Sequence, residues 1–238
     1  MPNKMTERNK TDIKRMFDKI APSYDRLNHL LSAGIDRSWR RRTARRVSRT
    51  APHDIADVAA GTGDLSIALA RRMPAAHITG IDLSDEMLAI GREKIRRRAL
   101  DERISLQQGD GENLPFKDES FDAVTIAFGI RNFADREAGL REALRILRPG
   151  GHLYILEFSM PRNPLFAPFY KLYFRNAVPA IGKIISKDAN AYDYLPHSVE
   201  QFPEKLLFLQ MMEGCGFTEC RMKNFMFGIA ILYEGVKK

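Results

Sequence analysis

Two glycines and an acidic residue form the strongest chemical signal in the sequence. Gly61 and Gly63 lie in the segment DVAAGTGD, directly after a short apolar run at 54–60, and glycine permits a tight turn that a ligand can approach closely. A helix after this turn would present unsatisfied N–H groups at its start. Asp82 follows a second apolar run about 20 residues further on, at the spacing where a carboxylate accepts hydrogen bonds from ribose hydroxyls. The pattern predicts a site for a cofactor that contains a nucleoside.

The residues that this turn lacks narrow the choice of cofactor. A dinucleotide-binding turn has a third glycine, in the pattern G-x-G-x-x-G, where this sequence has Ser66. Asp64 would also place negative charge where a pyrophosphate should lie. S-adenosylmethionine has no phosphate and carries a positive sulfonium, so acidic neighbours are tolerated or useful. Gly61, Thr62 and Gly63 are therefore predicted to bind S-adenosylmethionine, with an NAD-dependent oxidoreductase and a turn without a ligand as the weaker interpretations.

A second acidic residue belongs to the same predicted site. Asp110 and Gly111 end a third apolar run, in QGDGENLPF, where an acid can bond the adenine amino group and glycine leaves room for the ring. Ala127 and Phe128 end a fourth run, in AFGIRNF. Each of these residues has an alternative explanation as core packing. Their shared position at the ends of apolar runs favours the site, because the carboxyl ends of parallel strands meet at one edge of a sheet.

The elements that must position these residues alternate between strand and helix. Such alternation predicts an α/β fold with a parallel, doubly wound sheet. Two final strands at 218–225 and 229–235, separated by a short reversal, should pair antiparallel. Five parallel strands and a terminal hairpin give the strand count of the Class I methyltransferase sheet, a Rossmann-like arrangement, and we reach that name by comparison. The five strands are expected at 54–60, 77–83, 104–108, 121–128 and 152–158.

A single domain over 1–238 is expected, with helices added to this sheet. Residues 1–50 are predicted to form an N-terminal helical segment, in which Pro22 should end the first helix. Residues 160–200 are rich in aromatic residues and proline and are predicted to form an inserted helical cover. Pro149 and two glycines at 148–151 predict a turn before the fifth strand.

Composition and charge exclude several classes of protein. The sequence has 238 residues and a formal net charge of +8, and no stretch approaches the roughly 20 apolar residues of a membrane span. The N-terminus has no apolar core of a secretory signal, so a cytoplasmic protein is expected. Cys215 and Cys220 have no companions that complete a zinc set, so no metal is expected. Seven arginines between 37 and 49 indicate a solvated helix face, with attraction to an anionic membrane surface as the alternative. Nucleic acid is not expected as a partner, because no recognised binding motif accompanies the charge.

Nearly the whole chain resembles the ubiquinone/menaquinone biosynthesis C-methyltransferase family, whose bacterial menaquinone members are demethylmenaquinone methyltransferases. By that resemblance Thr62, Asp82, Asp110 and Gly111 contact the donor. Family members often have serine where this chain has Ala127, which removes one hydroxyl contact to the donor. The resemblance rests on FDKIAPSYDRLNHLLSAGIDRSWR (17–40), DVAAGTGD (57–64), QGDGENLPF (108–116), TIAFGIRNF (125–133), LRPGG (147–151), LEFSMPRNPL (156–165) and AYDYLPHSVEQFP (191–203).

The resemblance implies transfer of a methyl group from S-adenosylmethionine to a ring carbon of a reduced, prenylated quinol. Such a carbon attacks well only as the phenol, with a pKa near 10, loses its proton. Arg131 and Asn132 are predicted to polarise the quinol oxygen, although Arg131 has a structural salt bridge as its alternative. Tyr24 and Asp25 are predicted to close over the donor. Residues predicted to line the acceptor side are Tyr192, Tyr194 and His197.

The aromatic residues between 165 and 174 and the basic N-terminal helices are expected to make a transient membrane-facing mouth, so the protein would be peripheral to the inner face of the membrane. A demethylmenaquinol acceptor is favoured. A benzoquinol of ubiquinone biosynthesis, another phenolic or lipid acceptor, and an RNA-binding protein stay open as alternatives. The oligomeric state also stays open, with a homodimer as one option.

Overall fold

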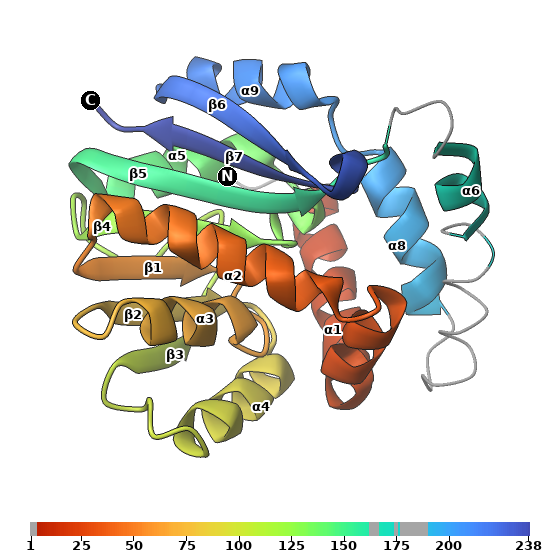
Figure 1. Ribbon diagram of the computed structural model, residues 1–238, viewed down its shortest axis with the longest axis horizontal. Coiled ribbons are helices and arrows are strands. Elements are labelled where there is room, and N and C mark those ends of the chain that lie inside the picture. The colour runs from red at the N-terminus through yellow and green to blue at the C-terminus, as the bar shows by residue number, and fades with distance from the viewer. Residues whose placement is uncertain (1–3, 162–166, 174–175, 177–189) are drawn as a thin grey trace.

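A mixed β-sheet runs through the molecule (Figure 1). The computed structural model describes residues 4–161, 167–173, 176 and 190–238. In this part of the chain the strands are β1 (Asp54–Val58), β2 (His77–Asp82), β3 (Ile104–Gln108), β4 (Phe121–Ala127), β5 (Leu147–Phe158), β6 (Thr218–Phe225) and β7 (Ala230–Val236). Their order is β3-β2-β1-β4-β5-β7-β6, and the first five are parallel. Because β1 pairs with both β2 and β4, the strand order reverses beside it, and a crevice opens at the carboxyl ends there.

The predicted sheet is confirmed, including its terminal hairpin. β7 pairs antiparallel with β5 and with β6, and the turn η4 (Met226–Gly228) joins β6 to β7. The segment 148–151, predicted to be a turn before the fifth strand, lies inside β5, which begins at Leu147, but it leaves the pairing with β4, whose partners change from Leu147 directly to His152. Gly150 donates its N–H to the carbonyl of Lys237 at 2.8 Å, and Lys237 donates to Gly151 at 2.9 Å. These bonds join the segment to the chain end, and within it Gly150 has a φ of +77°, in the left-handed region.

Helices cover both faces of the sheet. In Figure 1, α2 (Ile35–Val47) and α3 (Asp64–Arg72) cross in front of it and α5 (Arg136–Ile146) lies behind. The front core includes Trp39 and Leu69, with Leu88 from α4 (Asp85–Arg96). The rear core joins Leu140 of α5 to Phe208 of α9 (Lys205–Gly214). Short helical turns are η1 (Ser48–Thr50) and η2 (Ile130–Asn132).

The first helix differs from the prediction at Pro22. α1 (Lys4–Leu31) continues through this residue instead of ending at it. Proline in a helix interior removes one backbone hydrogen bond and costs about 3 kcal/mol. Here the apolar face continues on both sides of Pro22, with Ile20 before it and Leu27 after it, and both pack with Met87 of α4. Burial of this continuous face offsets the local cost.

The segment 160–200 is described only in part. It contains α6 (Ala167–Leu172) and α8 (Asn190–Glu200), which lie together at one side of Figure 1 near α1. Of the aromatic residues predicted to make a membrane-facing mouth, Phe166 and Phe174 lie outside the described residues, as does Leu165. In this part of the chain Leu172 and Tyr173 are exposed.

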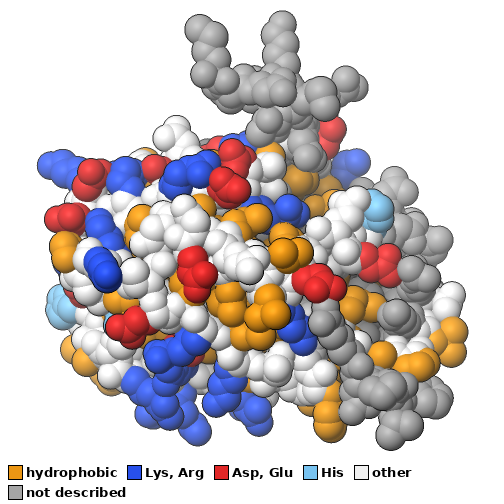
Figure 2. Space-filling view, turned by 90° about the horizontal axis from the view of Figure 1, so that it is seen from above, with side chains coloured by type: hydrophobic (Ala, Val, Ile, Leu, Met, Phe, Trp, Pro, Cys, Tyr) orange, Lys and Arg blue, Asp and Glu red, His pale blue; other side chains and the backbone are white. Residues whose placement is uncertain are grey.

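The described helices include none that is long and apolar enough to cross a membrane. The surface is unevenly charged. In Figure 2, basic side chains gather along the lower edge of the view, and apolar side chains lie beside them and extend to the right.

One buried carboxylate fastens α2 to the sheet. Glu234 of β7 is 4% exposed. Its two carboxylate oxygens accept from Arg46 Nε, at 2.8 and 2.9 Å, and Oε2 also accepts from Arg221 Nε at 3.0 Å. We expect Glu234→Ala to lower the free energy of unfolding by about 3 kcal/mol in urea denaturation, because two arginines lose a buried partner. Glu213→Ala, at an exposed position of α9, is the control and should change it by less than about 0.5 kcal/mol. Equal losses in the two variants would contradict this account of α2.

Candidate active site

An open hollow of about 730 Å³ lies at the carboxyl ends of β1, β2 and β4. α1 forms its outer wall, through Lys10, Phe17 and Tyr24. The crevice expected from the strand order is therefore occupied on one side by the N-terminal helix. Of the predicted site residues, those that line it are Tyr24, Gly61, Asp82, Asp110, Gly111, Ala127, Phe128 and Asn132.

The glycine turn and Asp82 are joined by a hydrogen bond. Gly61 and Gly63 have φ angles of +55° and +75°, in the left-handed region that glycine adopts with least strain. The N–H of Gly61 donates to Asp82 Oδ2 at 2.8 Å, and the N–H of Ser84 donates to Oδ1 at 2.9 Å. Burial raises the pKa of Asp82, against the opposing effect of these backbone donors. A carboxylate has about four acceptor sites, so this one keeps acceptor capacity beside the hollow.

Asp110 is held by a residue that sequence analysis missed. Lys10 Nζ lies 2.6 Å from Asp110 Oδ2 and 2.8 Å from Glu112 Oε2, so α1 is ion-paired to the loop after β3. Gly111 was predicted to leave room for the adenine ring, but in the structure it leaves room for a side chain of the protein. A Cβ added there would lie 2.5 Å from Phe133 Cζ and 2.9 Å from Val58 Cγ1, so the missing side chain makes room for the Phe133 ring.

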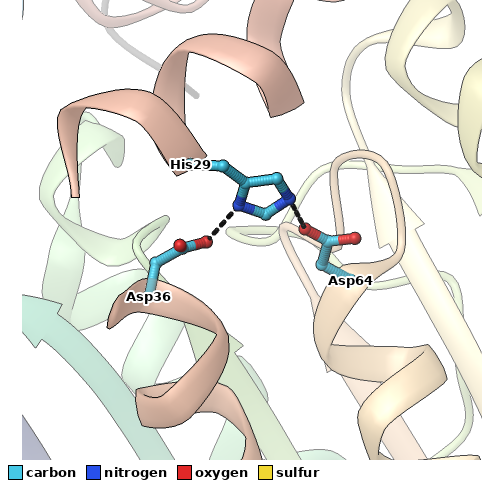
Figure 3. Close-up of side chains that lie close together, drawn as sticks. All are labelled: His29, Asp36 and Asp64. Carbon is cyan, nitrogen blue, oxygen red and sulfur yellow. Dashed lines mark hydrogen bonds and ion pairs between the residues drawn. The ribbon is translucent and has the colours of Figure 1, made fainter. Parts of the chain in front are cut away.

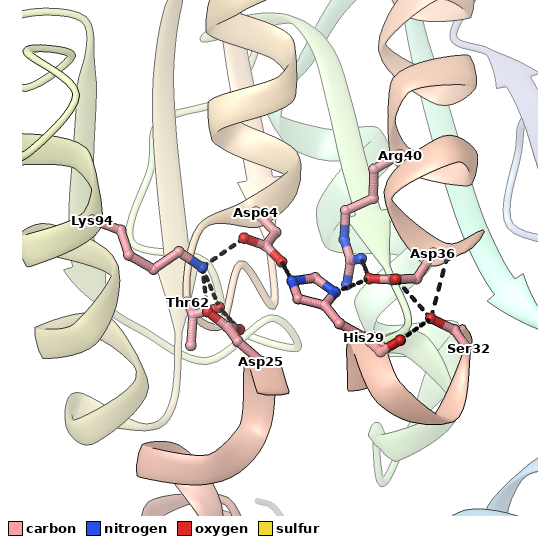
Figure 4. Close-up of polar contacts among 8 residues, drawn as sticks. All are labelled: Asp25, His29, Ser32, Asp36, Arg40, Thr62, Asp64 and Lys94. Carbon is pink, nitrogen blue, oxygen red and sulfur yellow. Dashed lines mark hydrogen bonds and ion pairs between the residues drawn. The ribbon is translucent and has the colours of Figure 1, made fainter. Parts of the chain in front are cut away.

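Thr62 is not among the described residues that line the hollow, and its side chain joins a polar network between α1, α3 and α4 (Figure 4). Its hydroxyl donates to Asp25 Oδ1 at 2.6 Å and accepts from Lys94 Nζ at 3.0 Å. Lys94 also lies 2.5 Å from both Asp25 Oδ2 and Asp64 Oδ1. Asp64 would have its pKa raised by burial, but the charges of Arg40 and Lys94 outweigh burial and lower it. Lys94 was not predicted from the sequence. It lies three residues after Gly91, which packs against the backbone of Thr62, so both residues are on the helix face beside the turn.

The same network contains a group that resembles a metal site (Figure 3). His29 lies 2.8 Å from Asp36 and 3.8 Å from Asp64, and the ligand atoms of the three residues lie within 4.8 Å of one another. Arg40 pairs with Asp36, and Lys94 pairs with Asp64. A metal ion would have to displace these cations, so the group is an ion-pair network between α1, α2 and α3.

Arg131 forms a structural salt bridge, which was the alternative to its predicted contact with the quinol oxygen. Its Nη1 lies 2.8 Å from Glu157 Oε1, and the same group donates to the carbonyl of Phe128. Both side chains of the pair are buried, and Arg131 is not among the described residues that line the hollow. Glu157, on β5, was not foreseen. The neighbouring Asn132 lines the hollow, and its Oδ1 accepts a hydrogen bond from Tyr194 at 3.0 Å.

The residues predicted to close over the donor and to line the acceptor side have different surroundings. Burial raises the pKa of Tyr24, which was predicted to close over the donor, and the positive charges of Arg131 and Arg40 oppose this rise. Burial also raises the pKa of Tyr194. His197 is exposed, and its Nε2 lies 2.8 Å from Gln201. The side chain of Tyr192 lies outside the described residues.

Lys94 gives a testable account of how α1 is held. Lys94→Met leaves two partly buried carboxylates without their cation, so we expect the free energy of unfolding to fall by about 2 kcal/mol. Lys14→Met breaks a more exposed pair with Asp18 within one helix, and should cost no more than about 0.5 kcal/mol. Urea denaturation of both variants makes the comparison, and similar losses would show that Lys94 has no special part.

Asp57 should make stability depend on pH. Its carboxylate accepts from Ser66 Oγ at 2.5 Å and from Thr125 Oγ1 at 2.8 Å, and burial raises its pKa from 3.8 to about 6. The folded protein then retains a proton that the unfolded chain loses as pH rises from about 4 to about 6. This group alone should lower the free energy of unfolding by up to about 3 kcal/mol over that window.

Asp57→Asn cannot ionise, so its stability relative to the wild type should rise over the same window. Denaturation at several pH values between 4 and 7 measures the difference. Asp122→Asn is the control, because burial at Asp122 is outweighed by the backbone N–H of Asp54 and by Arg148, which lower its pKa. It should show no such gain, and a flat difference for Asp57→Asn would contradict the raised pKa.

The chain is similar to known proteins over almost its full length. Residues 5–237 match the ubiE/COQ5 methyltransferase family. A ubiquinone/menaquinone biosynthesis C-methyltransferase UbiE of Geotalea daltonii is 47% identical over 98% of this chain and 99% of its own length. A demethylmenaquinone methyltransferase of Bacteroides fragilis is 42% identical over 94% of this chain and 92% of its own.

Solved structures agree on the fold. The [4+2]-cyclase SpnF has a TM-score of 0.67 at 19% identity, covering 94% of this chain and 95% of its own. A SAM-dependent methyltransferase of Aquifex aeolicus has a TM-score of 0.58 at 14% identity, covering 78% of this chain and 82% of its own. The glycine turn, the partly buried Asp82 and the match over residues 5–237 together lead to one conclusion: the chain belongs to the ubiE/COQ5 methyltransferase family and uses S-adenosylmethionine as its methyl donor.

Proposed function

We propose that this protein methylates a ring carbon of demethylmenaquinol, a prenylated naphthoquinol, to give menaquinol. The observation that carries the proposal is the hollow, which has acidic groups of β2 and β3 on one side and Tyr24 and Asn132 on another. Groups that can bind a nucleoside and groups that can contact an aromatic ring therefore surround one space. Relatives from Bacteroides fragilis, Porphyromonas gingivalis and Deinococcus radiodurans, at 42%, 44% and 46% identity, are named demethylmenaquinone methyltransferases, which supports the naphthoquinol.

In this proposal the acidic side of the hollow holds the donor. Asp82 accepts hydrogen bonds from the ribose hydroxyls, with its orientation fixed by the N–H groups of Gly61 and Ser84. Asp110 accepts from the adenine amino group, and Gly61 and Gly63 let the backbone approach the donor. Thr62 acts indirectly, because its hydroxyl holds Asp25 and Lys94. Bound there, the donor supplies a methyl group made electrophilic by the sulfonium.

The remaining wall positions the acceptor. The amide of Asn132 donates to the quinol oxygen and stabilises negative charge as the phenol loses its proton, while Tyr194 holds the amide oxygen. Arg131 contributes from behind this wall, as a positive charge fixed by Glu157. With the donor bound, Asn132 would hold the quinol with its ring carbon towards the donor's methyl group, and the protons of the hydroxyl and of the ring carbon would pass to solvent water at the open side of the hollow. Aromatic side chains of Phe17, Phe128 and Phe133 exclude water from the ring.

A benzoquinol is the second candidate, because relatives such as the one from Geotalea daltonii are named for both ubiquinone and menaquinone biosynthesis. The chemistry at the ring carbon is the same for both acceptors. An RNA-binding protein, the alternative from another class, is not supported by the family match.

Single-turnover methyl transfer from labelled S-adenosylmethionine tests the proposal, with a short-tailed demethylmenaquinol and the matching benzoquinol as acceptors. We expect product from the naphthoquinol. Product from the benzoquinol alone would overturn the acceptor, and donor binding without either product would overturn the quinol assignment while leaving the family intact.

Two variants should separate the donor side from the acceptor side. Asn132→Ala should slow methyl transfer about a hundredfold with donor affinity unchanged, because one donor to the developing charge is lost. Asp82→Asn should weaken donor binding about tenfold or more, measured by calorimetry. His197→Ala tests the residue that was predicted to line the acceptor side: an unchanged rate would remove His197 from the mechanism. Loss of donor affinity in Asn132→Ala would contradict the division of the hollow.

A further inference from the structure

Two histidine rings contact each other at the edge of the sheet opposite the hollow. His53 directly precedes β1, and His77 is the first residue of β2, so both lie at the amino ends of their strands. In Figure 1 this edge is the one away from α1. The ring centroids are 5.2 Å apart, and the ring planes are inclined at 51° to each other. Both residues are exposed, with 64% of the His53 side chain accessible, so the contact is not part of a core.

Backbone hydrogen bonds hold the two histidines in place. The N–H of His77 donates to the carbonyl of His53 at 2.8 Å. From the strand on the other side of β1, Asp122 Oδ2 accepts from the N–H groups of His53 and Asp54, both at 2.9 Å. Arg148 fixes this carboxylate through an ion pair with Oδ1 at 2.6 Å. His53 is therefore tied to the strands on both sides of β1, which limits the movement of the pair.

A carboxylate selects which nitrogen of His53 is free. Asp54 Oδ1 lies 3.3 Å from His53 Nδ1, while Arg148 holds Asp54 Oδ2 at 2.9 Å. A neutral imidazole that donates from Nδ1 to a carboxylate keeps the lone pair of Nε2 for another partner. Metal-binding histidines are commonly held in this way, because the carboxylate fixes the ring and its tautomer. In the part of the chain that the structure describes, no side chain forms a hydrogen bond or ion pair with the ring nitrogens of His77.

The separation of the two rings is the one that a shared metal ion requires. A zinc–nitrogen bond to imidazole is about 2.0–2.1 Å long and the ligands are arranged tetrahedrally, so two imidazoles on one zinc ion have ring centroids about 5 Å apart. The observed separation of 5.2 Å agrees with this value. Exposure of the rings leaves the other coordination positions to water.

The charges beside the pair also favour a cation. Beneath α1, Arg40 and Lys94 already occupy the carboxylates around His29. At the histidine pair, two carboxylates share one guanidinium, that of Arg148, so the ion-paired group next to the rings keeps one negative charge. A metal ion would therefore displace no cation there.

We propose that His53 and His77 form a binding site for a divalent transition-metal ion, with zinc as the expected ion and water completing its coordination. Imidazole nitrogen suits zinc, copper and nickel, whereas magnesium and calcium prefer oxygen ligands. The ion joins the segment before β1 to the start of β2, so it stabilises the folded chain. The site is independent of the proposed function, because it lies at the opposite edge of the sheet from the hollow. The sequence does not predict it, because the two histidines become neighbours only when β1 and β2 pair.

Calorimetric titration of the full chain with zinc chloride at neutral pH tests the site. We expect one zinc ion per chain and no binding heat with magnesium chloride. His53→Gln and His77→Gln should each weaken zinc binding by more than the roughly tenfold that loss of an outer-shell partner costs. The matched control is His197→Gln, at another exposed histidine, which should leave zinc affinity unchanged. His29→Gln should also leave it unchanged, since the network beneath α1 is filled by its own cations.

Copper(II) can locate the ion without any substitution. Its unpaired electron broadens NMR signals steeply with proximity, so a small amount should broaden the ring protons of His53 and His77 before those of His29, His152 and His197. Zinc should also raise the midpoint of thermal unfolding of the wild type and leave that of His77→Gln unchanged. Both glutamine variants of the pair should bind S-adenosylmethionine as the wild type does, which shows that they are folded.

Three results would overturn the proposal. One is equal zinc affinity in the wild type, His53→Gln and His77→Gln. Another is loss of zinc binding in His29→Gln while the variants of the pair retain it, because the ion would then belong to the network beneath α1. The third is a pattern of copper broadening that omits either His53 or His77, and this result decides the matter even if a variant fails to fold.

Discussion

The ammonium group of Lys94 connects the N-terminal helix to the glycine turn, and the shape of the hollow depends on that connection. It lies 2.5 Å from a carboxylate of α1 and 2.5 Å from the carboxylate that begins α3, and it donates to the hydroxyl of Thr62 between them. α1 supplies the outer wall of the hollow, so its position decides whether a closed space exists at the strand ends. A turn with GTGD is common to many folds, whereas a turn tied by Lys94 to a preceding helix defines one particular pocket.

The sheet was the most predictable part of the structure because its signals are local. The apolar runs at β3 and β6 match the observed strands residue for residue, and Ser84 caps α4 as its type and position predict, accepting from the N–H of Met87 at 3.2 Å. Asp82 was also foreseeable, since a carboxylate at the end of β2 has few other uses at that spacing. In each case neighbours in the sequence determine the outcome.

The predictions that differ from the structure have a common cause: contacts between residues far apart in the sequence determine the conformation there. Pro22 would end an isolated helix, but the face that α1 buries against α4 extends beyond it. The glycines at 150 and 151 were predicted to precede the fifth strand, but the chain after β7 pairs with them, so they lie within β5 as an irregular segment. Arg131 was predicted beside the acceptor, and its partner Glu157 lies on a strand whose register the sequence does not reveal. Lys10 and Lys94 were missed because only the folded chain brings them to their acids.

The ion pairs around the hollow also connect α1 to the residues that are proposed to bind the donor. Asp110 uses Oδ2 to hold Lys10 of α1 and Oδ1 to accept from the N–H of Glu112 at 2.9 Å. Under the proposed assignment the adenine amino group approaches this same carboxylate, so the donor and α1 share one acceptor. The N-terminal helix is then part of the donor site rather than a cover placed over a finished one. The charges fit this arrangement, since Lys10 and Lys94 balance part of the negative charge, while Asp82 forms no ion pair with a described residue and can favour a positively charged donor.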